Sequence, residues 1–127
     1  MPQEPTIALL QKSPLVRYSL ATRPAFLLAS IMPVCVGAAT ASYQGYAFHM
    51  GLFVLSILAI LFIHAGVNVI NDYYDEQNGT DRLNTERIYP FTGGGPFFQK
   101  KVVNAPQNLP FSLRFFRGAV LFGVFLV

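Results

Sequence analysis

The feature that most constrains this chain is a run of 47 consecutive residues, from 24 to 70, without a single Lys, Arg, Asp or Glu. A water-soluble fold of 127 residues cannot easily bury so long an uncharged stretch. About 20 helical residues, at ~1.5 Å each, cross the ~30 Å hydrocarbon core of a bilayer, so the run is long enough for two crossings. Only 12% of the residues are charged, about half the share typical of soluble domains. The sequence therefore predicts an all-α, multi-pass transmembrane protein.

Proline and glycine mark the ends of the two predicted crossings. Pro24 suits the first turn of a helix, where its missing N–H has no partner to lose, so the first crossing is predicted over residues 24–43. Gly45 permits a turn after it. The second crossing is predicted over residues 49–74, and Asn-Gly at 78–79 is typical of a helix end.

The rest of the chain divides around this hairpin. The last ten residues, 118–127, are apolar but would reach only about 15 Å as a helix, half of a bilayer. We therefore expect the chain to be the N-terminal part of a longer multi-span protein. The predicted segments are a cytoplasmic tail with an interfacial helix at 1–22, a transmembrane hairpin at 23–76, a Gly- and Pro-rich loop at 77–113 and an incomplete third helix at 114–127.

The placement of basic residues predicts the orientation. All nine Lys and Arg lie outside the stretch between the two predicted crossings. We therefore expect a protein of the cell (inner) membrane. By the positive-inside rule, its N-terminus and residues 72–114 face the cytoplasm. The net charge of +3 requires no nucleic-acid partner. Cys35 is the only cysteine, so no intrachain disulfide can form.

Four polar side chains form a stripe at the end of the second crossing. His64, Asn68, Asp72 and Asp75 are spaced by 4, 4 and 3 residues, which places them on one face of a helix. A polar stripe on an apolar helix is expected to face a cavity or a partner helix rather than lipid. Two carboxylates at i and i+3 repel each other unless a cation lies between them.

Mg²⁺ suits this arrangement because it takes oxygen ligands and is typically held by one or two carboxylates plus substrate phosphates. The sequence predicts Asp72 and Asp75 as metal ligands. His64 alone is more often a hydrogen-bonded core histidine, and Asn68 can equally form an interhelical hydrogen bond.

Basic and glycine-rich positions follow in the predicted loop. Arg87, Lys100 and Lys101 are candidates to contact diphosphate directly, although the positive-inside bias alone explains basic residues there. Thr92 and Gly93 open the string TGGGP, whose backbone N–H groups can approach phosphate, although such strings also mark plain loops.

Two competing motifs fail on spacing. Residues 75–86 have the length of an EF-hand loop, but the glycine required at its sixth position is Thr80. The glycines at 93–95 lack the Lys-Ser/Thr ending of a nucleotide-binding P-loop.

The acidic string resembles a known family. Asn71-Asp72-x-x-Asp75 resembles the first aspartate-rich motif of the UbiA superfamily of intramembrane prenyltransferases. The fuller string NDYYDEQNGTD at 71–81, with PFTGG at 90–94, is similar to the branch that prenylates 1,4-dihydroxy-2-naphthoate in menaquinone biosynthesis. Arg23-Pro24 also resembles the start of that family's first helix.

This resemblance implies a UbiA-like helical bundle of about nine spans, with this chain holding about the first two to three. It implies Mg²⁺-dependent transfer of a polyprenyl group from polyprenyl diphosphate to an aromatic acceptor within the lipid bilayer. By this resemblance Asn68, Asp72 and Asp75 would hold the Mg²⁺, and Asp72, Asp75 and Arg87 would be catalytic. The substrate-binding residues would be Asn68, Asn71, Asp81, Lys100, Lys101, Thr92 and Gly93. The family's second aspartate-rich motif is absent from these 127 residues, so the chain alone is expected to be inactive.

Two other hypotheses remain open. Another UbiA-type transferase would act on 4-hydroxybenzoate, homogentisate or haem. The non-enzymatic alternative is a truncated membrane protein: a small membrane-anchored or divalent-cation-binding protein, or the product of a disrupted reading frame.

Overall fold

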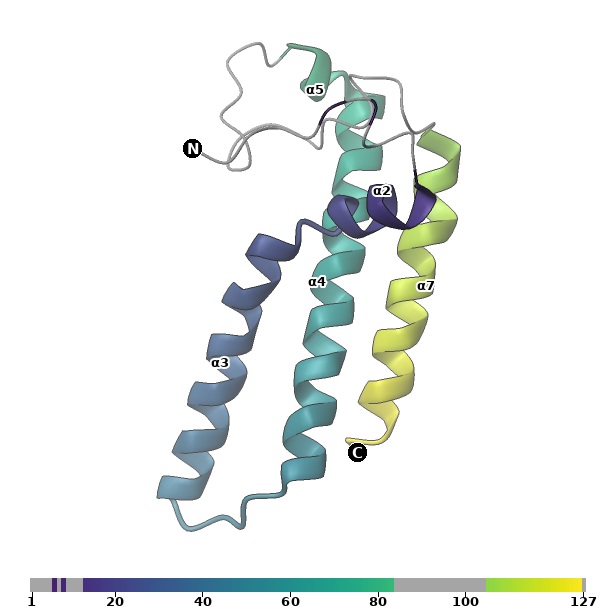
Figure 1. Cartoon of the computed structure of the whole chain (residues 1–127). Helices are drawn as coiled ribbons and strands as arrows, with labels where there is room; N and C mark the ends of the chain where they lie inside the picture. The colour runs from purple at the N-terminus through teal and green to yellow at the C-terminus, as the bar shows by residue number, and fades with distance from the viewer. Residues whose placement is uncertain (1–5, 7, 9–12, 84–104, 127) are drawn as a thin grey trace.

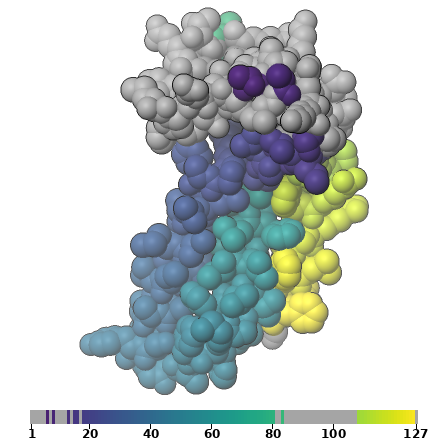
Figure 2. Space-filling model, viewed as in Figure 1, coloured from purple at the N-terminus to yellow at the C-terminus, as the bar shows by residue number. Residues whose placement is uncertain are grey.

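The computed structural model describes residues 6, 8, 13–83 and 105–126, and most of those residues are helical with no strand among them. Three long helices lie side by side, with α4 between α3 and α7, and the short α2 crosses near one end (Figure 1). Figure 2 shows the three long helices as adjacent columns of atoms. The all-α prediction is confirmed. The elements are α2 (Pro14–Ala21), α3 (Pro24–Tyr43), α4 (Met50–Asn78), α5 (Thr80–Leu83) and α7 (Ala105–Val124).

Helices α3 and α4 begin and end close to the predicted positions. Pro24 opens α3, and Gly45 lies in the turn after it with a φ of 91°. Gly79 caps α4 with a φ of 76°, and its N–H donates to the carbonyl oxygen of Glu76 at 3.2 Å. Both glycines adopt the left-handed region that side chains disfavour, which explains why the helices end there. Both helices are long and apolar enough to cross a membrane.

Helix α7 begins earlier than the sequence predicts. Residues 105–113, expected to lie in the loop, form its first half. The reason is packing at one end of the helix. The Phe111 ring lies 4.4 Å from the Tyr18 ring of α2, and Ser112 is fully buried. Pro110 within the helix is therefore outweighed by contacts that a periodicity argument on apolar residues alone does not reveal.

The contact between α4 and α7 is close and aromatic. Gly66 of α4 faces the α7 rings, since an added Cβ there would lie 3.0 Å from Phe116 Cε1. An added Cβ at Gly118 of α7 would overlap the Phe62 ring. The Phe62 ring also meets the Phe115 ring edge-on at 5.7 Å. Glycine on each helix therefore admits aromatic rings from the other, which gives the interface its close packing.

The contact between α3 and α4 is much looser. No residue of α3 is buried, although all of its residues are described. At the Tyr43 end the two helices enclose an open groove of about 430 Å³, lined by small residues such as Gly37, Ala38 and Ala41 and by Phe53. At the other end, polar side chains join the helices. We call the whole contact between α3 and α4, with the groove at one end and the polar side chains at the other, the α3–α4 seam.

Candidate functional site

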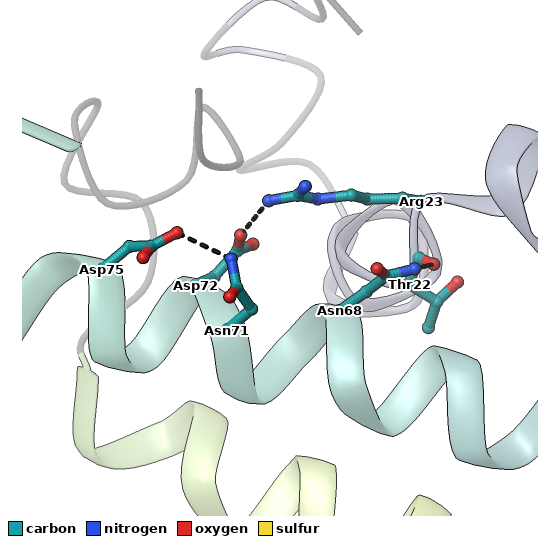
Figure 3. Close-up of polar contacts among 6 residues, drawn as sticks. All are labelled: Thr22, Arg23, Asn68, Asn71, Asp72 and Asp75. Carbon is teal, nitrogen blue, oxygen red and sulfur yellow. Dashed lines mark hydrogen bonds and ion pairs between the residues drawn. The ribbon is translucent and has the colours of Figure 1, made fainter. Parts of the chain in front are cut away.

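The candidate site lies where α2 turns into α3, against the last turns of α4 (Figure 3). Arg23 links the two helices with a φ of 52° and a ψ of 63°, a left-handed conformation that costs free energy for a residue other than glycine. Two α4 side chains one turn apart hold this joint. Asn68 Nδ2 donates to the Thr22 carbonyl oxygen at 2.8 Å, and Arg23 forms an ion pair with Asp72.

Asp72 is a buried carboxylate with a positively charged partner. Its side chain is fully buried, whereas that of Arg23 is 25% exposed. A buried carboxylate is costly unless a charge and hydrogen bonds compensate it. The sequence argument expects a metal cation to offset the repulsion between Asp72 and Asp75. At Asp72, the structure shows the guanidinium of Arg23 in that role.

Asp75 has a different environment one turn further along α4. Its Oδ2 accepts a hydrogen bond from Asn71 Nδ2 at 2.6 Å. Asn71 is exposed and Asp75 half-buried, so this pair is accessible where Asp72 is not. Figure 3 shows the two side chains reaching toward each other from successive turns.

Asn71 lies beside the predicted polar stripe. On a helix of 3.6 residues per turn, His64, Asn68, Asn71 and Asp75 share one face, while Asp72 is turned by about 100° from Asn71. Asn71 therefore lies next to Asp75, to which it is bonded, on the opposite edge of the stripe from Asp72. Asp72 projects to its side, where Arg23 reaches it.

The Asn71–Asp75 pair has donors that fit a divalent cation. The hydrogen bond uses Asn71 Nδ2 and Asp75 Oδ2, which leaves Oδ1 of each residue as an oxygen ligand. Mg²⁺ needs only one or two such ligands when substrate phosphates and waters supply the others. Asn68 retains only its amide oxygen for a cation, because its Nδ2 is bonded to Thr22. Within the described ranges, no three His, Cys, Asp or Glu residues form a cluster able to hold a metal alone.

Deeper along the stripe, His64 bridges α4 to α3. Its Nδ1 lies 2.5 Å from Ser30 Oγ. The hydrogen bond expected for His64 is present, but the side chain is half-buried rather than in the core. Its partner on the neighbouring helix was not predicted.

Several predicted site residues are not placed by the structure. Asp81 belongs to α5, but its side chain is not described. The others lie outside the described residues, namely Arg87, Thr92, Gly93, Lys100 and Lys101.

The sequence analysis did not predict Arg23 as a site residue. It used Arg23 only as a mark of the start of the first crossing. A signal was present. In an antiparallel hairpin, the first residues of one crossing and the last of the next meet at the same membrane boundary, which brings Arg23 level with Asp72. Ser30 carried no comparable signal, because a lone serine in an apolar helix usually bonds its own backbone.

Known proteins resemble this chain over half to two thirds of its length. UbiA prenyltransferase domain-containing protein 1 of Xenopus tropicalis is 38% identical over 69 residues, which are 54% of this chain and 20% of that protein. Its counterpart in Danio rerio is 32% identical over 80 residues, 63% of this chain and 24% of that protein. These matches support the UbiA superfamily.

The Drosophila melanogaster homolog adds a third UbiA match, 36% identical over 67 residues, or 51% of this chain and 19% of that protein. The chain therefore spans about a fifth to a quarter of the length of these UbiA relatives. No family model matches the chain, and no solved structure matches it. Two apolar helices together with UbiA relatives indicate a membrane protein.

Proposed function

We propose that the chain is part of a Mg²⁺-dependent prenyltransferase that moves a polyprenyl group from polyprenyl diphosphate to an aromatic acceptor. The observation that carries the proposal is the accessible Asn71–Asp75 pair at the end of a long apolar helix. Such a helix suits the apolar tail of a prenyl diphosphate, and the oxygen pair suits its metal-bound head. The UbiA relatives support the same reaction class.

The proposed acceptor is 1,4-dihydroxy-2-naphthoate, with demethylmenaquinone as product. The strings NGTD at 78–81 and PFTGG at 90–94 favour it over 4-hydroxybenzoate, homogentisate or haem. The proposed location is the cell (inner) membrane with the N-terminus in the cytoplasm, because the basic residues lie outside the hairpin turn.

Within the proposed site, two polar residues hold the cation and two others fix the α2–α3 joint. Asn71 and Asp75 hold the cation, which, when bound, offsets the negative charge that develops on the departing diphosphate. Asp72 keeps Arg23 in place and so fixes the α2–α3 joint beside the stripe. Asn68 fixes the same joint through Thr22 and retains an oxygen that can face the cation.

The remaining predicted residues supply charge and backbone contacts in this proposal. Arg87, Lys100 and Lys101 would neutralise diphosphate oxygens, since charge-assisted hydrogen bonds to phosphate are among the strongest available. Thr92 and Gly93 would bring backbone N–H groups to the same oxygens. Asp81 would support the cation through its carboxylate.

The proposal is tested by replacing Asp75 with Asn in the protein expressed from its own gene. We expect Mg²⁺-dependent transfer of a radiolabelled prenyl group to 1,4-dihydroxy-2-naphthoate to fall by at least about 100-fold, because a metal ligand is lost. Membrane insertion and stability should be unchanged, since Asp75 is half-buried and bonded only to an exposed partner.

Glu76→Gln is the matched control, because it removes the neighbouring carboxylate from the same turn. Its transfer rate should stay within about twofold of wild type, because Glu76 is not one of the proposed cation ligands. A wild-type rate in Asp75→Asn would contradict a metal role for this pair. A protein that binds Mn²⁺ at Asp75 but transfers no prenyl group to any of the named acceptors would favour the non-enzymatic alternative.

A further inference from the structure

His64 is an ionisable side chain in the middle of a helix that is long and apolar enough to span a membrane. Ionisable groups at such positions are rare, and where they occur they line a substrate path or pair with another group. Here the pairing accounts for one ring nitrogen only. Ser30 Oγ contacts Nδ1 at 2.5 Å, and Nε2 has no hydrogen-bond partner among the described residues.

The contact with Ser30 fixes the orientation of the imidazole ring. A histidine whose Nδ1 is held by a neighbour presents Nε2 in a defined direction, which is how histidines that bind substrates are commonly positioned. His64 is half-buried, as is Ser30. Nε2 is therefore oriented by the protein and not sealed in a packed core.

The place of His64 along α4 relates it to the proposed cation site. His64, Asn71 and Asp75 lie within about 40° of one another around α4, and His64 contacts α3 through Ser30. His64 and Asp75 are eleven residues apart, about 16 Å along the helix axis. This separation is comparable to the combined length of a metal-bound diphosphate and one aromatic ring. On the far side of His64, the α3–α4 seam opens into the apolar groove.

We propose that His64 Nε2 binds a ring hydroxyl of the aromatic acceptor, with Ser30 as the positioning residue. This inference rests on the proposed function and names the acceptor position within it. A phenolic hydroxyl is both a donor and an acceptor of hydrogen bonds. It can therefore pair with Nε2 whichever of the two ring nitrogens carries the proton.

The experiment measures binding without turnover. The chain in lipid nanodiscs is titrated with 4-hydroxy-2-naphthoate and with 2-naphthoate, which lacks the hydroxyl, and binding is followed by the fluorescence of the two probes. The wild type should bind the hydroxylated probe about three- to tenfold more tightly, the range expected for one net hydrogen bond. His64→Phe keeps a ring of similar shape and should bind both probes equally.

Two serine variants separate positioning from general packing. Ser30→Ala leaves His64 in place but releases its ring, so the preference for the hydroxylated probe should fall by about half or more. Ser56→Ala is the matched control, because its Oγ donates only to the backbone oxygen of Leu52 at 2.8 Å and it lines the groove of the same seam. That variant should keep the full preference.

The outcomes distinguish this inference from the proposed function. If the wild type shows no preference, or His64→Phe retains it, the inference is overturned. Mn²⁺ affinity and helix content by circular dichroism show whether each variant is folded. If His64→Phe does not fold, Ser30→Ala decides, and an unchanged preference overturns the inference. A wild-type chain that binds Mn²⁺ but neither naphthoate counts against the acceptor position alone, whereas a chain that binds no Mn²⁺ counts against the proposed function.

Discussion

The two faces of α4 are built from different chemistry. Toward α7 it presents Phe62, Gly66 and Val69, and the contact there is close and apolar. Toward α3 and the joint before it, the second half of α4 presents polar side chains, which bond Ser30 and the Thr22 carbonyl oxygen. The first face can be explained by packing alone. The second leaves α3 without a buried residue, so its polar groups are better explained by what they bind than by the stability they add.

The Arg23–Asp72 pair is where stability and site meet, and breaking it gives the largest expected effect. Arg23→Ala leaves a fully buried carboxylate without its ion-pair partner, which should lower the free energy of unfolding by about 3 kcal/mol. SDS titration of the chain in micelles, followed by circular dichroism, measures the change.

The control for this prediction is Arg117→Ala, since Arg117 is exposed on α7. It should change the unfolding free energy by less than about 0.5 kcal/mol. A double change, Arg23→Met with Asp72→Leu, should recover most of the loss, because both charges are removed together. An equal loss in the double variant would show that the charge pair is not the cause.

Packing on the α7 face gives the second effect. Gly118→Ala places a methyl group into the Phe62 ring and should cost about 1–3 kcal/mol of unfolding free energy. Gly123→Ala, on the same helix with no atom within 4 Å of the added Cβ, should instead be neutral or stabilise by up to about 1 kcal/mol. The same unfolding titration compares them. Equal effects would mean that the α4–α7 contact is not close-packed.

The hydrogen bond from Asn68 to Thr22 gives the smallest effect. Asn68→Leu should lower the unfolding free energy by about 1 kcal/mol, because one interhelical hydrogen bond is lost. Gln77→Ala removes an exposed bond to Tyr73 within α4 and should cost less than about 0.5 kcal/mol. A loss for Asn68→Leu larger than that for Gly118→Ala would contradict the division of roles between the two α4 faces.

Much of the fold was predictable because it depends on local chemistry. Pro24 and Gly79 set helix ends through backbone geometry that acts within a few residues. The start of α7 was not predictable in this way, because residues 105–113 are helical through contacts with α2 and α4 that lie far away in sequence.

The site was predictable in part for the same reason. Helical spacing correctly brought Asn68 and Asp75 to one face of α4, but it could not show that Arg23 reaches Asp72 or that Ser30 reaches His64. Those contacts depend on the register between α3 and α4, which the hairpin turn fixes and which the spacing within one helix does not contain. Asn71 was included among the substrate-binding residues, but its bond to Asp75 depends on side-chain rotamers.

The central claim is that Asn71 and Asp75 hold a divalent cation together with a diphosphate. The most direct measurement is electron–nuclear double resonance of Mn²⁺ bound to the chain in nanodiscs with a non-hydrolysable prenyl thiodiphosphate. The account predicts phosphorus coupling to the bound Mn²⁺ in the wild type and its loss in Asp75→Asn, with Glu76→Gln like the wild type. Phosphorus coupling of equal strength in Asp75→Asn, or no protein-bound Mn²⁺ in the wild type, would contradict it.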